Sequence, residues 1–315
     1  MSRYTDTEIE ELVEWIFTDD QAIHVMLNAY LDESFSAGEK HPVIAVGGGL
    51  GTGLQWKNLL KQWHKVLQTE PTVNVFHTNE FETPEGRSKS VYHAWEYSRL
   101  LAFNQGLTAA ICQNQIESVE VATVRPEEWD EVVKSRPRPI GKSFNAYTFC
   151  AHMLIDSIIY RANQFYPKQM VTYWFEEGGP HQRGIKRAYG EIAHNLEARN
   201  EHKFWKAPTF APKDSQMGLQ VADKLVYEGA KHTSHYFDTD PPLKNSEISP
   251  LTGERVWSIR YSSREWFASG LYLNVRRYPK EEMVAYFERM EAVAQTKDDA
   301  LNRKHQARKD KEKKA

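Results

Sequence analysis

Hydrophobic and polar residues follow one another along the chain in blocks whose spacing changes between that of strands and that of helices. Short apolar runs predict strands at 24–32, 41–49, 73–77 and 171–175. Apolar residues three and four positions apart predict helices at 5–17, 54–67, 85–105, 144–166, 184–200 and 216–230. Strands and helices that alternate in this way are typical of an α/β domain with helices packed on a central sheet.

Two further segments complete the predicted organisation. Residues 106–115 predict another strand, although the pattern there is ambiguous between strand and helix. Residues 231–275 contain two adjacent prolines and the alternating segment VWSIRYS, which predict a hairpin insertion before a charged helix that begins at Lys280. We therefore expect four regions: an N-terminal accessory helix (1–23), an α/β domain (24–230), a hairpin insertion with a C-terminal helix (231–300) and a basic disordered tail (301–315).

Composition limits the class of protein. A chain of 315 residues that is 40% hydrophobic can bury a substantial core. Its two cysteines, Cys112 and Cys150, lie in apolar segments and form neither a disulfide framework nor a cysteine-based zinc pattern. We find no signal peptide and no apolar run long enough to cross a bilayer, so we expect a cytoplasmic protein. The basic tail is expected to be solvated, with contact to nucleic acid as the less favoured alternative.

Carboxylates end two of the predicted strands. VMLNAYLDES places Asp32 and Glu33 at the tip of the first strand, and VTYWFEEGG places Glu176 and Glu177 at the tip of a later one. A single acid at a strand end is ordinarily just solvated. Two such pairs in one α/β sheet indicate more, because binding sites in these sheets form at strand ends.

A third acid lies on a predicted helix. Asp223 interrupts a run of small and apolar residues in GLQVADKLV, where an unpaired charge would be costly to bury. It is satisfied either by a salt bridge, to Lys224 or to an arginine, or by a cation shared with the strand acids. Converging carboxylates repel one another unless something positive lies between them, and Mg²⁺ or Mn²⁺ would serve, because both prefer carboxylate oxygen.

Four motifs resemble a known family. LDES at 31–34, FHTNEF at 76–81, FEEG at 175–178 and DSQMGLQVAD at 214–223 are together similar to the signature of domain of unknown function 3800. The resemblance covers roughly residues 24–230. It implies a ribonuclease H-like fold, with a mixed central sheet flanked by helices, and a metal-dependent nuclease activity that needs Mg²⁺ or Mn²⁺.

The resemblance also implies site residues. It makes Asp32, Asp223 and one of Glu176 and Glu177 the metal ligands, and it leaves open which glutamate reaches the metal. Family members commonly have glycine where this chain has Phe35, and often aspartate where Glu176 stands. Further candidates for the catalytic site are Glu33, His77 and Glu80.

Such a site supports in-line hydrolysis of a phosphodiester, with nucleic acid, DNA or RNA, as the expected partner. The expected substrate contacts are Arg136, Arg138 and Lys142 of the loop SRPRPIGKS, together with Asp214 and Gln220. Solvated surface is an equally good interpretation of the basic loop.

Two alternative functions use the same residues. The chain is then either a catalytically inactive module that binds nucleic acid or protein, or a hydrolase of small phosphorylated molecules. Other motifs carry no function. VGGGLGTG lacks the G-x-G-x-x-G spacing of a dinucleotide site, and the pairs His232–His235 and His194–His202 lack the further ligands that zinc requires.

Overall fold

The computed structural model describes residues 26–35, 41–114, 116–136, 144–167, 169–198, 207–236, 246–248, 255–260, 273–292 and 295. The predicted N-terminal helix and the basic tail lie outside these residues. Within the described part of the chain, no helix is long and apolar enough to cross a membrane.

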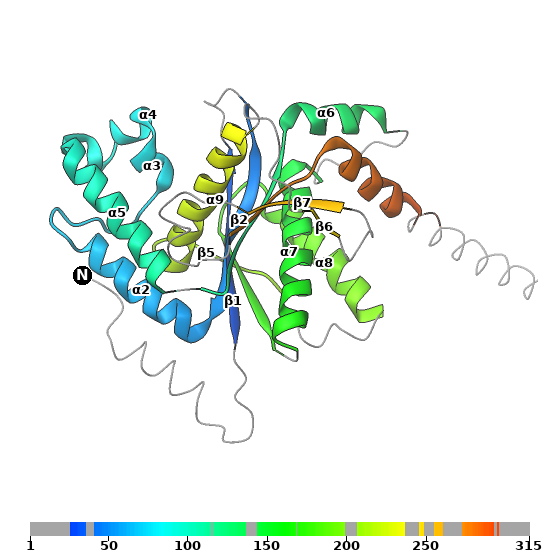
Figure 1. Cartoon of the computed structure of the whole chain (residues 1–315), viewed down its shortest axis with the longest axis horizontal. Coiled ribbons are helices and arrows are strands. Elements are labelled where there is room, and N and C mark those ends of the chain that lie inside the picture. Colours follow the sequence, from blue (N-terminus) through cyan, green and yellow to red (C-terminus); the bar gives the residue numbers. More distant parts are fainter. Residues whose placement is uncertain are drawn as a thin grey trace, which may run out of the picture.

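A mixed sheet forms the centre of the molecule (Figure 1). Its strands are β1 (Leu27–Phe35), β2 (Ile44–Thr52), β3 (Ser118–Val124), β4 (Val171–Glu176), β5 (Thr209–Ala211), β6 (Ser246–Ile248), β7 (Arg255–Arg260) and β8 (Leu273–Arg277). Six strands in the order β5-β4-β1-β2-β3-β8 make up its main part, and the antiparallel strands β7 and β6 extend it beyond β8. In the main part β2 runs antiparallel to both of its neighbours, whereas the other adjacent pairs are parallel.

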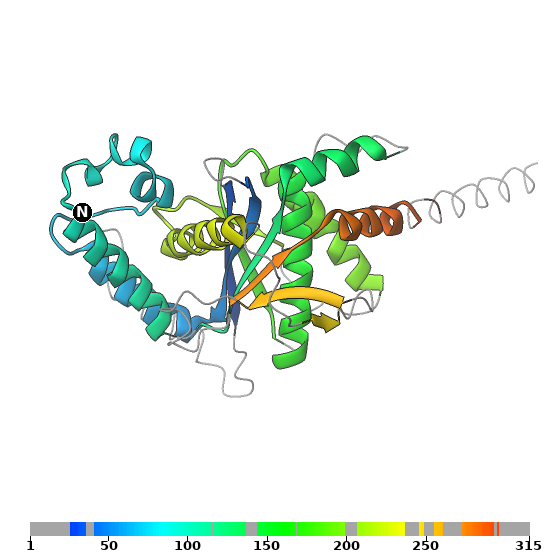
Figure 2. The same cartoon turned by 45° about the horizontal axis from the view of Figure 1, so that its top comes forward.

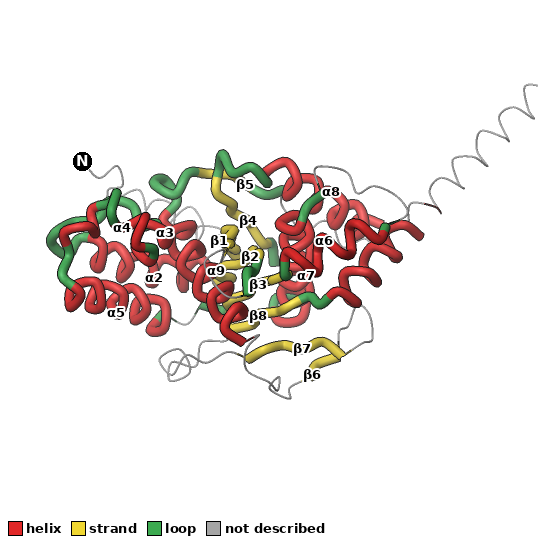
Figure 3. Tube along the Cα trace, turned by 90° about the horizontal axis from the view of Figure 1, so that it is seen from above, coloured by secondary structure: helices red, strands yellow, loops and turns green. Residues whose placement is uncertain are grey.

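Helices cover both faces of the sheet, as Figure 3 shows from above. One layer contains α2 (Gly53–Leu67), α3 (Thr78–Glu82), α4 (Pro84–Arg87), the short 3₁₀ helix η1 (Val91–Ala94), α5 (Tyr97–Gln113) and α9 (Met217–Tyr236). The other contains α6 (Pro126–Ser135), α7 (Ala146–Phe165), α8 (Gln182–Ala198) and a helix at 280–292. Figures 1 and 2 show α9 and α7 on opposite sides of β1 and β2.

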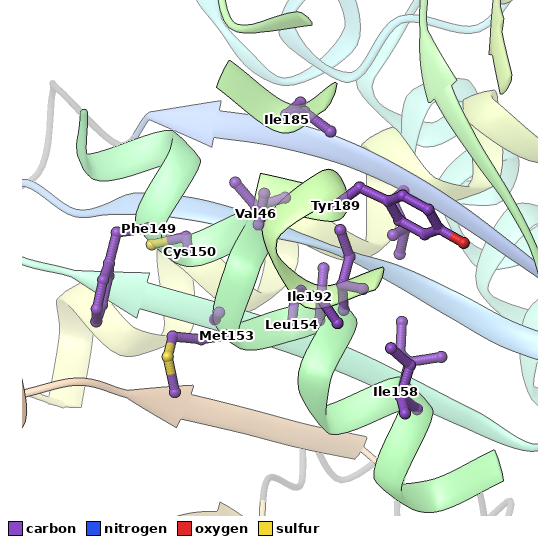
Figure 4. Close-up of a cluster of buried hydrophobic side chains, with 14 of the residues drawn as sticks. Val46, Phe149, Cys150, Met153, Leu154, Ile158, Ile185, Tyr189 and Ile192 are labelled. Carbon is purple, nitrogen blue, oxygen red and sulfur yellow. The ribbon is translucent and has the colours of Figure 1, made fainter. Parts of the chain in front are cut away.

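The two faces of β1 enter two different cores, because successive side chains of a strand point to opposite sides. Leu27, Ala29 and Leu31 pack against α7 and α8. Figure 4 shows part of that cluster, with Leu154 of α7 and Ile192 of α8. Tyr30 instead belongs to the core beneath α9, α2 and α5. The same alternation places the next even-numbered residue of β1, Asp32, on the α9 face.

Local hydrogen bonds determine where the main helices begin. Thr52 and Gln55 form a capping box at the start of α2, since the Gln55 amide donates to Thr52 Oγ1 and the Thr52 amide donates to Gln55 Oε1. At the start of α7 the side chain of Asn145 accepts from the amide of Thr148. Both caps follow directly from short polar motifs in the sequence.

The predicted α/β class, with a mixed sheet flanked by helices, is confirmed. Three strand predictions, at 24–32, 41–49 and 171–175, correspond to β1, β2 and β4. The predicted helices at 54–67, 144–166, 184–200 and 216–230 correspond to α2, α7, α8 and α9.

Two strand predictions are wrong. Residues 73–77 form no strand; Val73 and Phe76 are buried, but the Phe76 amide donates to the side chain of Gln220 rather than to another strand. Residues 106–115 lie mostly in α5, where Leu107, Ala110 and Ile111 are buried at helical spacing. The predicted helix at 85–105 correspondingly begins only at Tyr97.

Four elements were not predicted: α3, β3, α6 and β8. Every residue of β3 is buried, including the polar side chains of Ser118, Glu120 and Thr123. These polar residues interrupt the apolar run that identifies a buried strand. Neighbouring strands on both sides enclose β3, and a single sequence does not reveal such neighbours.

Candidate active site

Two acids of the candidate site lie side by side at the carboxyl ends of parallel strands. Leu31 of β1 is paired with Phe175 of β4, so the next residues, Asp32 and Glu176, stand at neighbouring positions. Asp32 and Glu176 lie on the same face of the sheet as Tyr30 and Trp174, each of which is two residues earlier in its strand. The rings of Tyr30 and Trp174 stack on the α9 side of the sheet, with centroids 5.9 Å apart. Asp32 is 3% exposed, whereas the side chain of Glu176 is 37% exposed.

A lysine reaches the same place from the neighbouring strand. Glu176 is paired with Ala211, the last residue of β5, and Lys213 lies two residues farther along the chain. Its Nζ is 2.8 Å from Asp32 Oδ2, 3.1 Å from Glu176 Oε2 and 3.2 Å from Asp223 Oδ2. One buried ammonium group is therefore shared by three carboxylates that come from two strands and a helix.

Helix α9 orients the third acid and the lysine. The Thr78 amide donates to Asp223 Oδ2 at 3.0 Å, which fixes one oxygen of that carboxylate. One turn earlier, the buried side chain of Gln220 accepts from the Phe76 amide and donates to the Lys213 carbonyl, at 3.1 and 3.0 Å. Gln220 and Asp223 together hold the segment before α3 and the loop after β5 against α9.

The charges at the site are unbalanced, because Lys213 neutralises only one of several acids. Burial raises the pKa of the Asp32 carboxyl, and the charge of Asp223 adds to this effect. Burial and the charge of Glu176 raise the pKa of Glu33 to about 7. For Lys213, burial alone lowers the pKa, but the charges of Asp32 and Asp223 outweigh it and raise the pKa above its usual range. The excess of negative charge favours a divalent cation over a single ammonium group at this place.

The donor atoms suit a hard metal ion. Mg²⁺ and Mn²⁺ prefer carboxylate oxygen, which Asp32, Glu176 and Asp223 supply. As the carboxylates lie, however, no cluster of His, Cys, Asp and Glu in the described part of the chain is arranged to bind a metal directly. Lys213 Nζ lies among their oxygens instead, at 2.8 to 3.2 Å. The residues supply the kind of oxygen that such a metal needs, around a point that the ammonium group occupies.

The structure distinguishes the two glutamates at the end of β4. Glu176 contacts Lys213, whereas the side chain of Glu177 is exposed and its amide donates to the Ala211 carbonyl at 2.9 Å. The alternation of the strand places only the first of the pair on the α9 face. Of the two candidate ligands, Glu176 joins Asp32 and Asp223.

The remaining catalytic candidates lie around this group. Glu33 follows Asp32 on the opposite, α7 face, where its charge acts on the hydroxyl of Tyr147. His77 is half-buried and precedes α3, and it is the amide of the next residue that contacts Asp223. Glu80 is exposed, and its charge acts on Tyr92.

Two of the five predicted substrate contacts, Arg136 and Gln220, are held by other parts of the protein. The prediction that Arg136 contacts a substrate is corrected, because its side chain is 6% exposed and pairs with Glu291 at 2.5 Å, on the helix at 280–292. Gln220 is also not a surface contact, since it is buried and hydrogen-bonded at both ends of its amide. Asp214 is exposed beside Lys213. Arg138 and Lys142 lie outside the described residues.

The sequence did not indicate Lys213, which is the residue at the centre of the group. The available signal was its position, two residues after the short strand β5 and directly before the motif DSQMGLQVAD at 214–223. Lysine in a proline-containing loop is normally solvated, so that position by itself predicts an exposed side chain. The signal becomes specific only when the pairing of β5 with β4 is known.

Comparisons of the chain with protein-family models, with curated proteins and with solved structures gave no match. The resemblance to domain of unknown function 3800 therefore stays a prediction. Since a fold alone does not determine a function, the function has to be argued from the carboxylates and the lysine.

Proposed function

We propose that the chain is a metal-dependent nuclease that hydrolyses phosphodiester bonds of nucleic acid with Mg²⁺ or Mn²⁺. The observation that carries the proposal is that Asp32, Glu176 and Asp223 each place an oxygen within 3.2 Å of one point, where Lys213 Nζ lies. Carboxylates that come from separate elements and meet at strand ends are common ligands of a divalent cation.

The mixed sheet with helices on both faces supports the ribonuclease H-like architecture that the resemblance implies. In this sheet β1 and β4 are parallel neighbours, so Asp32 and Glu176 lie next to each other. The extension by β8, β7 and β6 lies at the opposite edge from β5, away from the carboxylates.

Each residue of the site would have a distinct role toward the metal. Asp32, Glu176 and Asp223 would hold the metal, which when bound supplies a polarised water and neutralises charge on the phosphate. The Thr78 amide keeps one Asp223 oxygen in place, and Gln220 keeps α9 in register with the loop that carries Lys213. Asp32 is the most buried of the three acids, so its side chain has the least freedom to move.

One observation favours a second function, that of a catalytically inactive binding module. Lys213 already provides a cation for the three carboxylates, and a protein that had lost its metal would need such a substitute. Metal binding separates the two functions, because the module would bind no Mn²⁺ at millimolar concentration.

The proposal is tested with single-stranded DNA and RNA oligonucleotides in the presence of Mn²⁺. We expect Asp32→Asn, Glu176→Gln and Asp223→Asn each to lower the cleavage rate by at least about a hundredfold, because each removes a charged metal ligand. Glu177→Gln is the matched control, since that neighbouring side chain is exposed. Circular dichroism checks that every variant remains folded.

Metal-dependent cleavage that persists in both Asp32→Asn and Asp223→Asn would contradict the proposal. A mononucleotide phosphate serves as a second substrate. If the protein hydrolyses the mononucleotide and leaves the oligonucleotides intact, the site belongs to a hydrolase of small phosphorylated molecules.

A further inference from the structure

Lys213 occupies the position that a divalent cation would take among the three carboxylates. We infer that Lys213 is an internal counter-ion: it holds the site together in the metal-free protein, and a metal binds by displacing its ammonium group. The inference rests on the proposed function, because it concerns the metal of that site. It adds a competition between Lys213 and the metal, which regulates when the site is loaded.

The contact distances make the two cations mutually exclusive. The ammonium group lies 2.8 to 3.2 Å from one oxygen of each carboxylate. Mg²⁺ requires the same oxygens at about 2.1 Å. Two positive charges would then lie within a few ångströms of each other in a buried place, where their repulsion is only weakly screened. Hence the metal enters only when the ammonium leaves.

Backbone hydrogen bonds hold the main chain at Lys213 in place, while its side chain is free to rotate away from the carboxylates. The Lys213 carbonyl accepts from Gln220, and the Ser215 amide and hydroxyl both donate to the Pro212 carbonyl, which closes a turn around the lysine. The side chain itself has four rotatable bonds and reaches the carboxylates with its last atom. Of its three partners, Glu176 is the most exposed, with 37% of its side chain accessible to solvent.

The physical role of the lysine follows from the metal-free state. Without it, Asp32, Glu176 and Asp223 would repel one another at short range in a buried site. Lys213 removes that repulsion, so the carboxylates are already in place when the metal arrives. The cost is a lower apparent affinity for the metal, because binding must include the release of the ammonium.

The same helix offers a matched control. Lys224 is completely buried and is the neighbour of Asp223, but its Nζ donates to Asn104 Oδ1 at 2.6 Å and to Glu228 Oε1 at 3.3 Å. It therefore has partners of its own on α5 and α9. Removing Lys224 takes away a buried lysine without taking away a cation of the carboxylate group.

Calorimetric titration with Mn²⁺ compares the wild type with Lys213→Met and Lys224→Met. We expect Lys213→Met to bind Mn²⁺ at least about tenfold more tightly than the wild type, the lower end of the coupling between close buried charges. Lys224→Met should bind like the wild type. Equal or weaker binding by Lys213→Met would overturn the inference and leave the proposed function standing. If neither the wild type nor Lys213→Met binds Mn²⁺, the proposed function fails and the inference fails with it.

A second measurement uses only the wild type and does not depend on the folding of a variant. Acetic anhydride labels lysine amines, and mass spectrometry reports the extent at each position. We expect Lys213 to be protected without metal and to become severalfold more reactive with saturating Mn²⁺, whereas Lys224 stays protected under both conditions. Protection of Lys213 that is unchanged by bound Mn²⁺ would overturn the inference.

Discussion

Two sets of buried polar side chains among the described residues lie in contrasting environments. Asp32 and Lys213 lie in the carboxylate group, where opposite charges meet at the end of the sheet. His152 of α7 lies instead inside a helical layer, 7% exposed, with its Nδ1 2.9 Å from the Tyr286 hydroxyl. The first kind carries the proposed chemistry, while the second bears on stability.

His152 makes the stability of the fold depend on pH. Burial lowers the pKa of His152 to about 4, whereas in the unfolded chain it is near its ordinary value of about 6.5. Below pH 6.5 the unfolded chain therefore binds a proton that the folded chain does not, and this contribution to stability is lost as the pH falls toward 4. We expect this imidazole to contribute a loss of about 2 kcal/mol between pH 7 and 5, measured by urea unfolding as the difference between the wild type and a variant without it.

The variant His152→Gln isolates this effect from other titrating groups. The free energy of unfolding should fall less between pH 7 and 5 in His152→Gln than in the wild type. Identical pH profiles for the wild type and His152→Gln would show that the buried imidazole does not contribute.

Among the elements, α9 determines the geometry of the site because it lies unusually close to the sheet. A Cβ atom at Gly218 would come within 2.5 Å of the Tyr30 ring, and one at Gly229 within 2.9 Å of Val121. Tyr30 cannot move aside easily, since its ring packs against Trp56 and Trp174. The close approach brings Asp223 down to Asp32.

A methyl group at Gly218 should separate α9 from β1. We expect Gly218→Ala to destabilise the protein by about 1 to 3 kcal/mol through overpacking, and to weaken Mn²⁺ binding because Asp223 moves with the helix. Gly190→Ala is the control: it lies in α8 with no atom within 4 Å of the added Cβ, so it should stabilise by about 0.5 to 1 kcal/mol. Chemical unfolding and calorimetry measure both effects, and equal stabilities for the two variants would rule out this account of α9.

Prediction of elements from the sequence succeeded where an element's own residues determine it. The periodic apolar residues of α2, α7 and α9 indicate helices, because one face of each packs on the sheet. The segment 73–77 looked like a strand for the same apolar reason, but its backbone partner is the side chain of Gln220, 144 residues away along the chain. A local sequence pattern indicates that a segment is buried, but it does not indicate which distant segment forms hydrogen bonds with its backbone.

At the scale of the whole molecule, the sheet collects residues that lie far apart in the sequence. The strands β1, β4 and β5 are parallel, so Asp32, Glu176 and Lys213 meet on the carboxyl-terminal side of these strands. Helix α9 adds Asp223 from one face of the sheet. A cation bound at this place would link two strands and a helix. Its binding energy would therefore stabilise the fold as a whole.

We expect Mn²⁺ to raise the free energy of unfolding by about 2.7 kcal/mol when its free concentration is a hundredfold above the dissociation constant. Differential scanning fluorimetry would show this as a higher melting temperature with Mn²⁺ than without. Asp223→Asn should lose most of the shift, while Glu177→Gln should keep it. A shift of the same size in Asp223→Asn would place the stabilising metal at another site.

The sequence by itself determined the α/β class, the positions of the strands β1, β2 and β4 and of the long helices α2, α7, α8 and α9, and the candidacy of Asp32 and Asp223. These follow from the spacing of apolar residues and from the cost of placing a charge among them, both of which are local properties. The tertiary structure decided that Glu176 rather than Glu177 joins the group, that Arg136 is buried in an ion pair, and that Lys213 lies at the centre. Each of these depends on strand register or helix packing between distant segments, and no window along the chain contains both partners.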